Sequence, residues 1–152
     1  MLFPFIGNVS GPETGTSVAL RRCGRLSDQH TRLAMTLTAL ALNCSLKGSA
    51  ESSSTDKLLA ETLAELSRHG VSGDIVRVVD LNVKPGVRSD EGDGDAWPDL
   101  REKVLQADIL VFGTPIWLGQ PSSVAKRVLE RMDAFLGETD DQQRMPPYGK
   151  VA

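Results

Sequence analysis

The sequence has little cysteine, histidine or aromatic residue, little net charge, and no long hydrophobic run. Its 152 residues include two cysteines, two histidines and 5% aromatic residues, and the formal net charge is -3. Cys23 and Cys44 cannot form a disulfide framework, and no metal-ligand spacing is present. No apolar run approaches the roughly 20 residues that span a bilayer. These absences argue against a disulfide-rich secreted protein, a metal centre, a membrane protein and a nucleic-acid-binding protein, and favour a cytoplasmic one.

Residues 1–34 differ in composition from the rest of the chain. Gly, Ser, Thr, Pro and Arg dominate, and no helical or strand period persists. We expect either a disordered extension or sequence upstream of a true initiator at Met35. An arginine-containing targeting peptide is the alternative. The folded domain is therefore predicted to cover residues 35–152.

Strand and helix patterns alternate from residue 35 onward. The predicted strands are residues 36–43, 74–80 and 108–113, and the predicted helices are residues 54–69, 97–106 and 121–136. This alternation predicts an α/β protein with a parallel sheet covered by helices. Tyr148–Ala152 resembles the start of a fourth strand. Because a three-stranded parallel sheet would expose an apolar edge, we expect the chain to be part of a longer domain.

The loop after the first predicted strand is rich in hydroxyl groups. Between residues 43 and 55 the candidate phosphate ligands are Ser45, Lys47, Ser53, Ser54 and Thr55. Hydroxyls and backbone N–H groups at the positive amino end of a helix can cradle a phosphate. The loop is neither a P-loop nor a G-x-G-x-x-G turn. A serine-rich surface loop that caps the helix is the alternative.

A second loop follows the third predicted strand. It runs through Thr114, Pro115, Ile116, Trp117, Leu118 and Gly119. In open α/β sheets ligands bind at the carboxyl ends of the strands, so both loops are candidates for one site. Trp117 offers an aromatic plate for a flat ring, although it could instead pack under the following helix or in a subunit interface.

Three other features have ordinary structural interpretations. We expect Cys44 to be a buried thiol rather than a reactive one. The acidic residues 90–95 lack the spacing of a calcium loop and are predicted to form a solvated loop. Charged residues of the last helix are predicted to form its exposed face; they are Lys126, Arg127, Glu130 and Arg131.

The two loops resemble those of a known family. The matching segments are residues 41–47, residues 53–59, and residues 107–123 with the pattern T-P-I-W-L-G-Q-P-S-S. In these segments the chain is similar to NAD(P)H-dependent FMN reductases of the flavodoxin-like superfamily. That resemblance implies a three-layer, doubly wound parallel sheet with strand order 2-1-3-4-5, of which the last strands are missing here.

The same resemblance implies a flavin site. Ser45, Lys47, Ser53, Ser54 and Thr55 would surround the phosphate of FMN, and residues 114–119 would line its isoalloxazine ring. NADPH or NADH would be the co-substrate, and a flavin, a quinone or another small molecule would accept the electrons. No side chain need act as acid or base. Relatives of this kind also imply a homo-oligomer.

Three alternatives remain open from the sequence. The first is a flavodoxin-type electron carrier, which binds FMN but does not oxidise NAD(P)H. The second is a flavin-free interaction domain on the same scaffold, because fold does not determine function. The third is an inactive truncated fragment of a flavodoxin-like domain.

Overall fold

A parallel three-stranded sheet forms the centre of the protein. The computed structural model describes residues 36–152, so the predictions for residues 1–34 lie outside the described part. The strands are β1 (Thr38–Asn43), β2 (Ser72–Arg77) and β3 (Ile109–Gly113), in the order β2-β1-β3. Both neighbours run parallel to β1, which confirms the predicted order of the first three strands.

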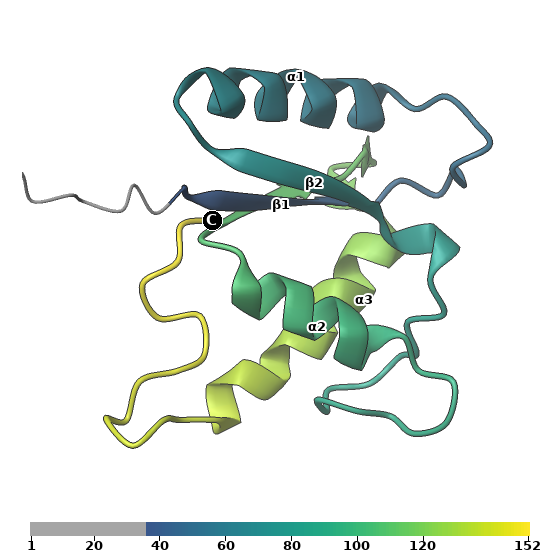
Figure 1. Cartoon of the computed structure of the whole chain (residues 1–152). Coiled ribbons are helices and arrows are strands. Elements are labelled where there is room, and N and C mark those ends of the chain that lie inside the picture. The colour runs from purple at the N-terminus through teal and green to yellow at the C-terminus, as the bar shows by residue number, and fades with distance from the viewer. Residues whose placement is uncertain (1–35) are drawn as a thin grey trace, which may run out of the picture. The chain divides into compact units, whose positions relative to one another are not determined.

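Helices cover both faces of the sheet. Helix α1 (Ser54–Arg68) lies on one face, and α2 (Trp97–Gln106) and α3 (Ser123–Met132) lie on the other (Figure 1). This three-layer arrangement is the predicted α/β class. Gly70, with φ +79°, follows α1 and supplies the left-handed residue that often ends a helix.

The bounds of two predicted elements were wrong. The second strand was expected over residues 74–80, but it spans Ser72–Arg77 and is followed by a 3₁₀ helix, Val78–Asp80. Its partner β1 ends at Asn43, directly opposite Arg77, so no ladder is available beyond that point. The last helix was expected over residues 121–136. It ends at Met132 and is followed by a separate 3₁₀ helix, Asp133–Gly137.

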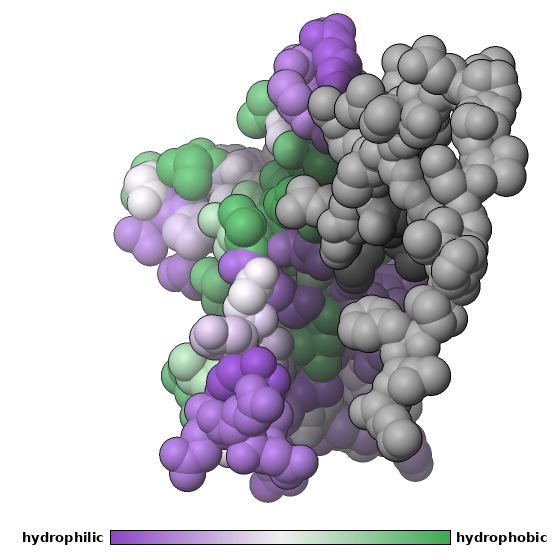
Figure 2. All heavy atoms as spheres, turned by 60° about the vertical axis from the view of Figure 1, so that its left-hand side comes forward, coloured by the Kyte–Doolittle hydropathy of each residue, from purple (hydrophilic) through white to green (hydrophobic). Residues whose placement is uncertain are grey.

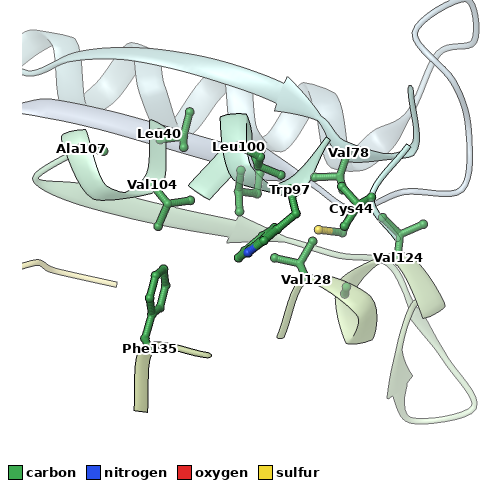
Figure 3. Close-up of a cluster of buried hydrophobic side chains, with 13 residues drawn as sticks. Leu40, Cys44, Val78, Trp97, Leu100, Val104, Ala107, Val124, Val128 and Phe135 are labelled. Carbon is green, nitrogen blue, oxygen red and sulfur yellow. The ribbon is translucent and has the colours of Figure 1, made fainter. Parts of the chain in front are cut away.

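The main hydrophobic core lies between the sheet and helices α2 and α3. Figure 3 shows Trp97 at its centre, with side chains from β1, α2 and α3 around it. The predicted apolar stripe of α3 enters this core: Val124, Val128 and Phe135 are buried, and Met132 packs against them. Burial of this stripe holds the helix against the sheet.

One residue of the acidic loop and one residue of α3 differ from prediction. Asp95 was expected in a solvated loop and Arg131 on an exposed helix face, but both side chains are 0% exposed and are 2.7 Å apart in an ion pair. Arg131 also lies over the ring of Trp97 at 5.7 Å. A buried charge must be paired, so each residue accounts for the burial of the other.

The chain reaches the outer edge of β3 near residue 151. Val151 forms a parallel bridge with Ile109, and its carbonyl accepts a hydrogen bond of 2.7 Å from the Leu110 N–H. The beginning of a fourth strand predicted at residues 148–152 is therefore confirmed at Val151 alone. Lys150 Nζ donates to two carbonyls at the end of α2, where the helix dipole favours a cation.

Apolar side chains also reach the surface. The face in Figure 2 shows hydrophobic surface next to strongly hydrophilic regions. Four of the exposed large hydrophobic residues belong to the two candidate ligand loops; they are Leu46, Ile116, Trp117 and Leu118. None of the helices within residues 36–152 has the length and apolar character that crossing a membrane requires.

Candidate flavin site

The two candidate loops lie side by side at the carboxyl edge of the sheet. They follow the neighbouring parallel strands β1 and β3, so both leave the sheet at the same edge. The Cys44 N–H donates to the Gly113 carbonyl at 2.8 Å. The Ser122 hydroxyl donates to the Cys44 carbonyl at 2.5 Å. These bonds join the start of the first loop to both ends of the second, which brings the predicted site residues together.

A cavity of about 220 Å³ lies between the loops. Hydroxyl groups, one ammonium group and one indole ring contribute to its walls. Its lining residues are Ser45, Leu46, Lys47, Ser53, Ser54, Thr55, Pro115 and Trp117. All five predicted phosphate residues, and two of the six predicted ring residues, therefore line one cavity.

The amino end of α1 forms one wall of this cavity. Ser53 is the N-cap residue, and its side chain makes no capping hydrogen bond. The first backbone bond of the helix is from the Lys57 N–H to the Ser53 carbonyl, at 3.1 Å. The preceding amides have no partner within the helix, and they carry its positive partial charge. This arrangement suits an anion such as a phosphate.

Lys47 adds a full positive charge to the cavity wall. Its Nζ donates to the Ser52 carbonyl at 3.2 Å, so the side chain crosses the loop. The Ser45 hydroxyl donates to the Lys47 carbonyl at 3.3 Å, and Ser45 is itself buried. The loop is thus internally bonded, with a cation and hydroxyl groups beside the helix end.

The second loop is a short hairpin that the sequence pattern did not predict. Strands β4 (Ile116–Trp117) and β5 (Gln120–Pro121) pair antiparallel, and Leu118 and Gly119 form the turn with φ of 50° and 76°. Positive φ at both central residues is typical of a type I′ turn. Trp117 lines the cavity and is 49% exposed, whereas Leu118 is fully exposed at the tip. Ile116 is also largely exposed, so the assignment of Ile116, Leu118 and Gly119 to a flavin ring stays a prediction.

Thr114 has a structural role at the base of the hairpin. Its hydroxyl donates to the Pro115 carbonyl at 3.1 Å and accepts from the Ser122 N–H at 3.0 Å. Thr114 also lines an adjoining groove of about 410 Å³. That groove shares Ser54, Thr55 and Pro115 with the cavity, so the two form neighbouring parts of one surface depression.

Behind the first candidate loop lies a polar network that sequence reasoning missed. Asn43 Nδ2 donates to Asp56 Oδ1 at 2.9 Å, and Asn43 Oδ1 accepts from the Ser45 N–H at 3.0 Å. Arg77 pairs with Asp56 at 2.7 Å. Hydrogen bonds from Arg77 and then from Asn43 hold the pKa of Asp56 below its usual value. An asparagine at the end of an otherwise apolar strand, and an arginine within a short strand, were the available signals.

Cys44 is a buried thiol, as the sequence predicted. Its side chain is fully buried in the core cluster. Burial raises the pKa of the thiol to about 12, so the thiolate is scarce at neutral pH. The thiolate is the nucleophilic form of cysteine, and this residue is therefore a small core side chain rather than a reactive group.

Fold and site together define a flavodoxin-like α/β protein with a candidate phosphate site at the carboxyl edge of its sheet. The model of the NADPH-dependent FMN reductase family matches residues 37–152. The chain belongs to this family. Membership is consistent with a flavin-related, oxidoreductase-like protein.

Two curated relatives share substantial sequence identity. The chain is 34% identical over 127 residues to the 8-demethyl-8-aminoriboflavin-5′-phosphate synthase of Streptomyces davaonensis, covering 78% of this chain and 49% of that protein. It is 41% identical over 119 residues to a Mycobacterium bovis protein described as divalent metal cation transporter MntH, covering 76% of this chain but 17% of that protein. The chain therefore spans about half the length, or less, of these relatives.

A solved structure shows the same fold. It is RosB with the bound intermediate 8-demethyl-8-formylriboflavin-5′-phosphate. The TM-score is 0.68 at 34% sequence identity, and the match covers 76% of this chain and 50% of RosB. The ligand in that structure is a riboflavin 5′-phosphate derivative.

Proposed function

We propose that this chain carries the FMN-binding loops of an NAD(P)H-dependent FMN reductase-like flavoprotein. The observation that carries the proposal is the cavity where the uncapped amino end of α1, the hydroxyls of the first loop and the ring of Trp117 converge. Membership of the FMN reductase family supports it. The acceptor is proposed to be a flavin, a quinone or another small molecule.

The residues present fit the phosphate end of FMN. A phosphate dianion requires several donors at a site of positive potential. Ser45, Ser54 and Thr55 offer hydroxyls, Lys47 offers an ammonium group, and the helix end offers backbone N–H groups. Trp117 and the apolar hairpin would flank the ring.

The chain's own residues would hold the ligand rather than react with it. When bound, FMN would supply the redox chemistry between NADPH or NADH and the acceptor. Trp117 would shield one side of the ring from water. Cys44, the nearest thiol in the loop, is buried and protonated, so it offers no competing nucleophile.

The first test is a fluorescence titration of the full chain with FMN and, separately, with riboflavin. FMN should bind more tightly than riboflavin, because only FMN presents a phosphate. Thr55→Val removes one hydroxyl of the cavity while preserving volume. Loss of one hydrogen bond to a charged group costs about 1.5–3 kcal/mol, which is about tenfold to hundredfold in Kd. Ser67→Ala, near the other end of the same helix, is the control. It should change neither the affinity for FMN nor the affinity for riboflavin.

The second test separates the proposed activity from its alternatives. Oxidation of NADPH and of NADH is followed at 340 nm with FMN present, using free flavin or a quinone as acceptor. Turnover with either coenzyme supports the reductase. Tight FMN binding with no oxidation of either coenzyme supports a flavodoxin-type electron carrier, and absence of FMN binding contradicts the flavin site.

A second candidate is that the site takes a riboflavin 5′-phosphate as substrate rather than as a resident cofactor. The 34% identity to an aminoriboflavin-phosphate synthase, and the RosB complex with a formylated riboflavin 5′-phosphate, favour this candidate. Mass spectrometry of the flavin after incubation with the protein distinguishes the two. An unchanged flavin mass after turnover supports the cofactor role.

The location and assembly state belong to the same proposal. We place the protein in the cytoplasm, where NADPH and NADH are available as co-substrates. A homo-oligomer is proposed because the apolar hairpin tip, with Leu118 fully exposed, lies beside the cavity. Light scattering at several protein concentrations measures the mass of the assembly, and a monomer throughout would contradict it.

A further inference from the structure

Arg77 reaches from the end of β2 to the phosphate loop. Its side chain is only 10% exposed, and it does not line the cavity. One guanidinium nitrogen, Nη1, donates to the Gly48 carbonyl at 2.6 Å and to the Glu51 carbonyl at 2.9 Å. The other, Nη2, lies 2.7 Å from Asp56 Oδ1. A single side chain therefore holds both the middle of the loop and the first turn of α1.

The network extends from Arg77 to the beginning of the loop. Asp56 accepts a hydrogen bond from the side-chain amide of Asn43, and the side-chain oxygen Oδ1 of Asn43 accepts from the Ser45 N–H. Asn43 is the last residue of β1 and is fully buried. The loop is thus tied to Arg77 at its start through Asn43, at its middle through backbone carbonyls, and at its end through Asp56.

Asp80 reinforces the same side of the loop. Its carboxylate accepts the Ser49 N–H, with both oxygens at 3.2 Å. Gly48 has little space there, because a Cβ at this position would lie 3.0 Å from Asp80 Oδ1. The back of the loop is therefore closely fitted to the end of β2.

This arrangement has an electrostatic consequence for an anion site. Carbonyl oxygens repel a phosphate, whereas N–H groups and hydroxyls attract it. Arg77 holds two loop carbonyls toward itself and neutralises the carboxylate of Asp56, which lies in the first turn of the helix that would receive the phosphate. Holding these groups in place before a ligand arrives lowers the ordering cost of binding.

We propose that Arg77 is a positioning residue that sets the affinity of this site for the 5′-phosphate without contacting it. The proposal rests on the proposed function, because it assumes that the loop receives the phosphate of a flavin. Under this proposal, a residue of β2 determines how tightly the site holds the phosphate. Of the three strands, β2 is the one farthest from the Trp117 hairpin.

The test compares Arg77→Met with Arg68→Met in the full chain. Arg68 is a highly exposed arginine near the end of α1 that pairs with Glu65, so its loss controls for net charge. For Arg77→Met we expect Kd for FMN to rise about tenfold or more, with Kd for riboflavin nearly unchanged. Arg68→Met should change neither value. Equal weakening of both ligands, or no weakening of FMN, would overturn the proposal.

Arg77→Lys separates positioning from charge. Lysine keeps the positive charge but cannot reproduce the planar fork that spans two carbonyls and a carboxylate. We expect Kd for FMN in Arg77→Lys to stay close to that of Arg77→Met. Recovery of the wild-type Kd would show that charge alone matters and would overturn the positioning role.

Hydrogen exchange gives a readout that needs no ligand. In Arg77→Met, amides of residues 46–53 should exchange faster, while those of residues 97–106 in α2 should be unchanged. Unchanged exchange in the loop would overturn the proposal. If the wild-type chain binds neither flavin, the proposed function fails together with the phosphate role of Arg77, whereas the exchange result still decides whether Arg77 holds the loop.

Discussion

Removing the charge of Asp95 should destabilise the protein more than any other change in the acidic loop. Its side chain is fully buried against Arg131. Oδ1 accepts from the N–H groups of Lys84 and Trp97, both at 3.1 Å, and Oδ2 accepts from that of Glu91 at 3.0 Å. The carboxylate thus joins the loop to both α2 and α3.

The lowered pKa of Asp95 gives the size of its contribution to the free energy of unfolding. Burial by itself would raise that pKa, but the N–H groups of Glu91, Lys84 and Trp97, with the guanidinium of Arg131, outweigh burial and lower it to about 2 from its ordinary 3.8. At 1.36 kcal/mol per pKa unit, the ionised carboxylate contributes about 2 kcal/mol to the free energy of unfolding.

The sign of the pH dependence follows from the lowered pKa. The folded state binds this proton less readily than the unfolded state, so the contribution is fully present well above pH 3.8. It declines as the pH falls through 3.8 toward 2, and it is absent below about pH 2. Raising the pH above 6 should not change it.

Urea unfolding of Asp95→Asn, followed by circular dichroism, checks the magnitude. The variant removes the contribution of about 2 kcal/mol and also leaves the charge of Arg131 buried without an anion, so we expect a larger total loss of about 3–5 kcal/mol at pH 7 that shrinks toward pH 3. Asp93→Asn, an exposed position in the same loop, is the control and should change stability by less than about 0.5 kcal/mol.

Replacing both partners tests whether the unpaired charge of Arg131 causes the stability loss of Asp95→Asn. Asp95→Asn combined with Arg131→Met removes both charges, and we expect it to recover part of the stability lost in the single variant, because no unpaired buried charge remains. Equal stability losses in Asp95→Asn and Asp93→Asn, or a loss that does not depend on pH, would refute the reasoning.

Three further predictions concern the base of the site. Ser122→Ala removes the cap of α3 and a donor to the Cys44 carbonyl, so urea unfolding should show a loss of about 1–3 kcal/mol that exposed Ser123→Ala does not reproduce. In a Cys23→Ser background, iodoacetamide at pH 8 should modify Cys44 only after urea is added, and rapid labelling of the native protein would contradict its raised pKa. Gly113→Ala places a methyl carbon 2.8 Å from a side chain of α1, so unfolding should show a loss of about 1–3 kcal/mol, and wild-type stability would mean that α1 shifts freely.

Local patterns were sufficient for the order and type of the main elements. Apolar strands and amphipathic helices alternate along the chain, and this predicted the α/β class and the helices covering the sheet. The hydroxyl-rich loop and the T-P-I-W-L-G segment predicted which residues would gather at the carboxyl edge. Seven of those residues line one cavity because parallel neighbouring strands must end at the same edge.

What the sequence could not determine depends on partners distant in the chain. The end of β2 is set by the length of β1, because a strand needs a ladder partner. The burial of Asp95 requires Arg131, and the two are separated in the sequence by α2, β3 and the β4–β5 hairpin. Each looks like an ordinary surface charge when only its neighbours in sequence are considered.

The same reason explains why Arg77 was missed. By itself, the sequence determined a flavodoxin-like sheet with two candidate ligand loops at one edge. Only the tertiary structure decided which side chains hold those loops, because Arg77 contacts Gly48, Glu51 and Asp56, which lie 29, 26 and 21 positions before it in the sequence. Periodicity and local motifs record which face of an element is buried, whereas a hydrogen bond between distant segments exists only after the strands are paired.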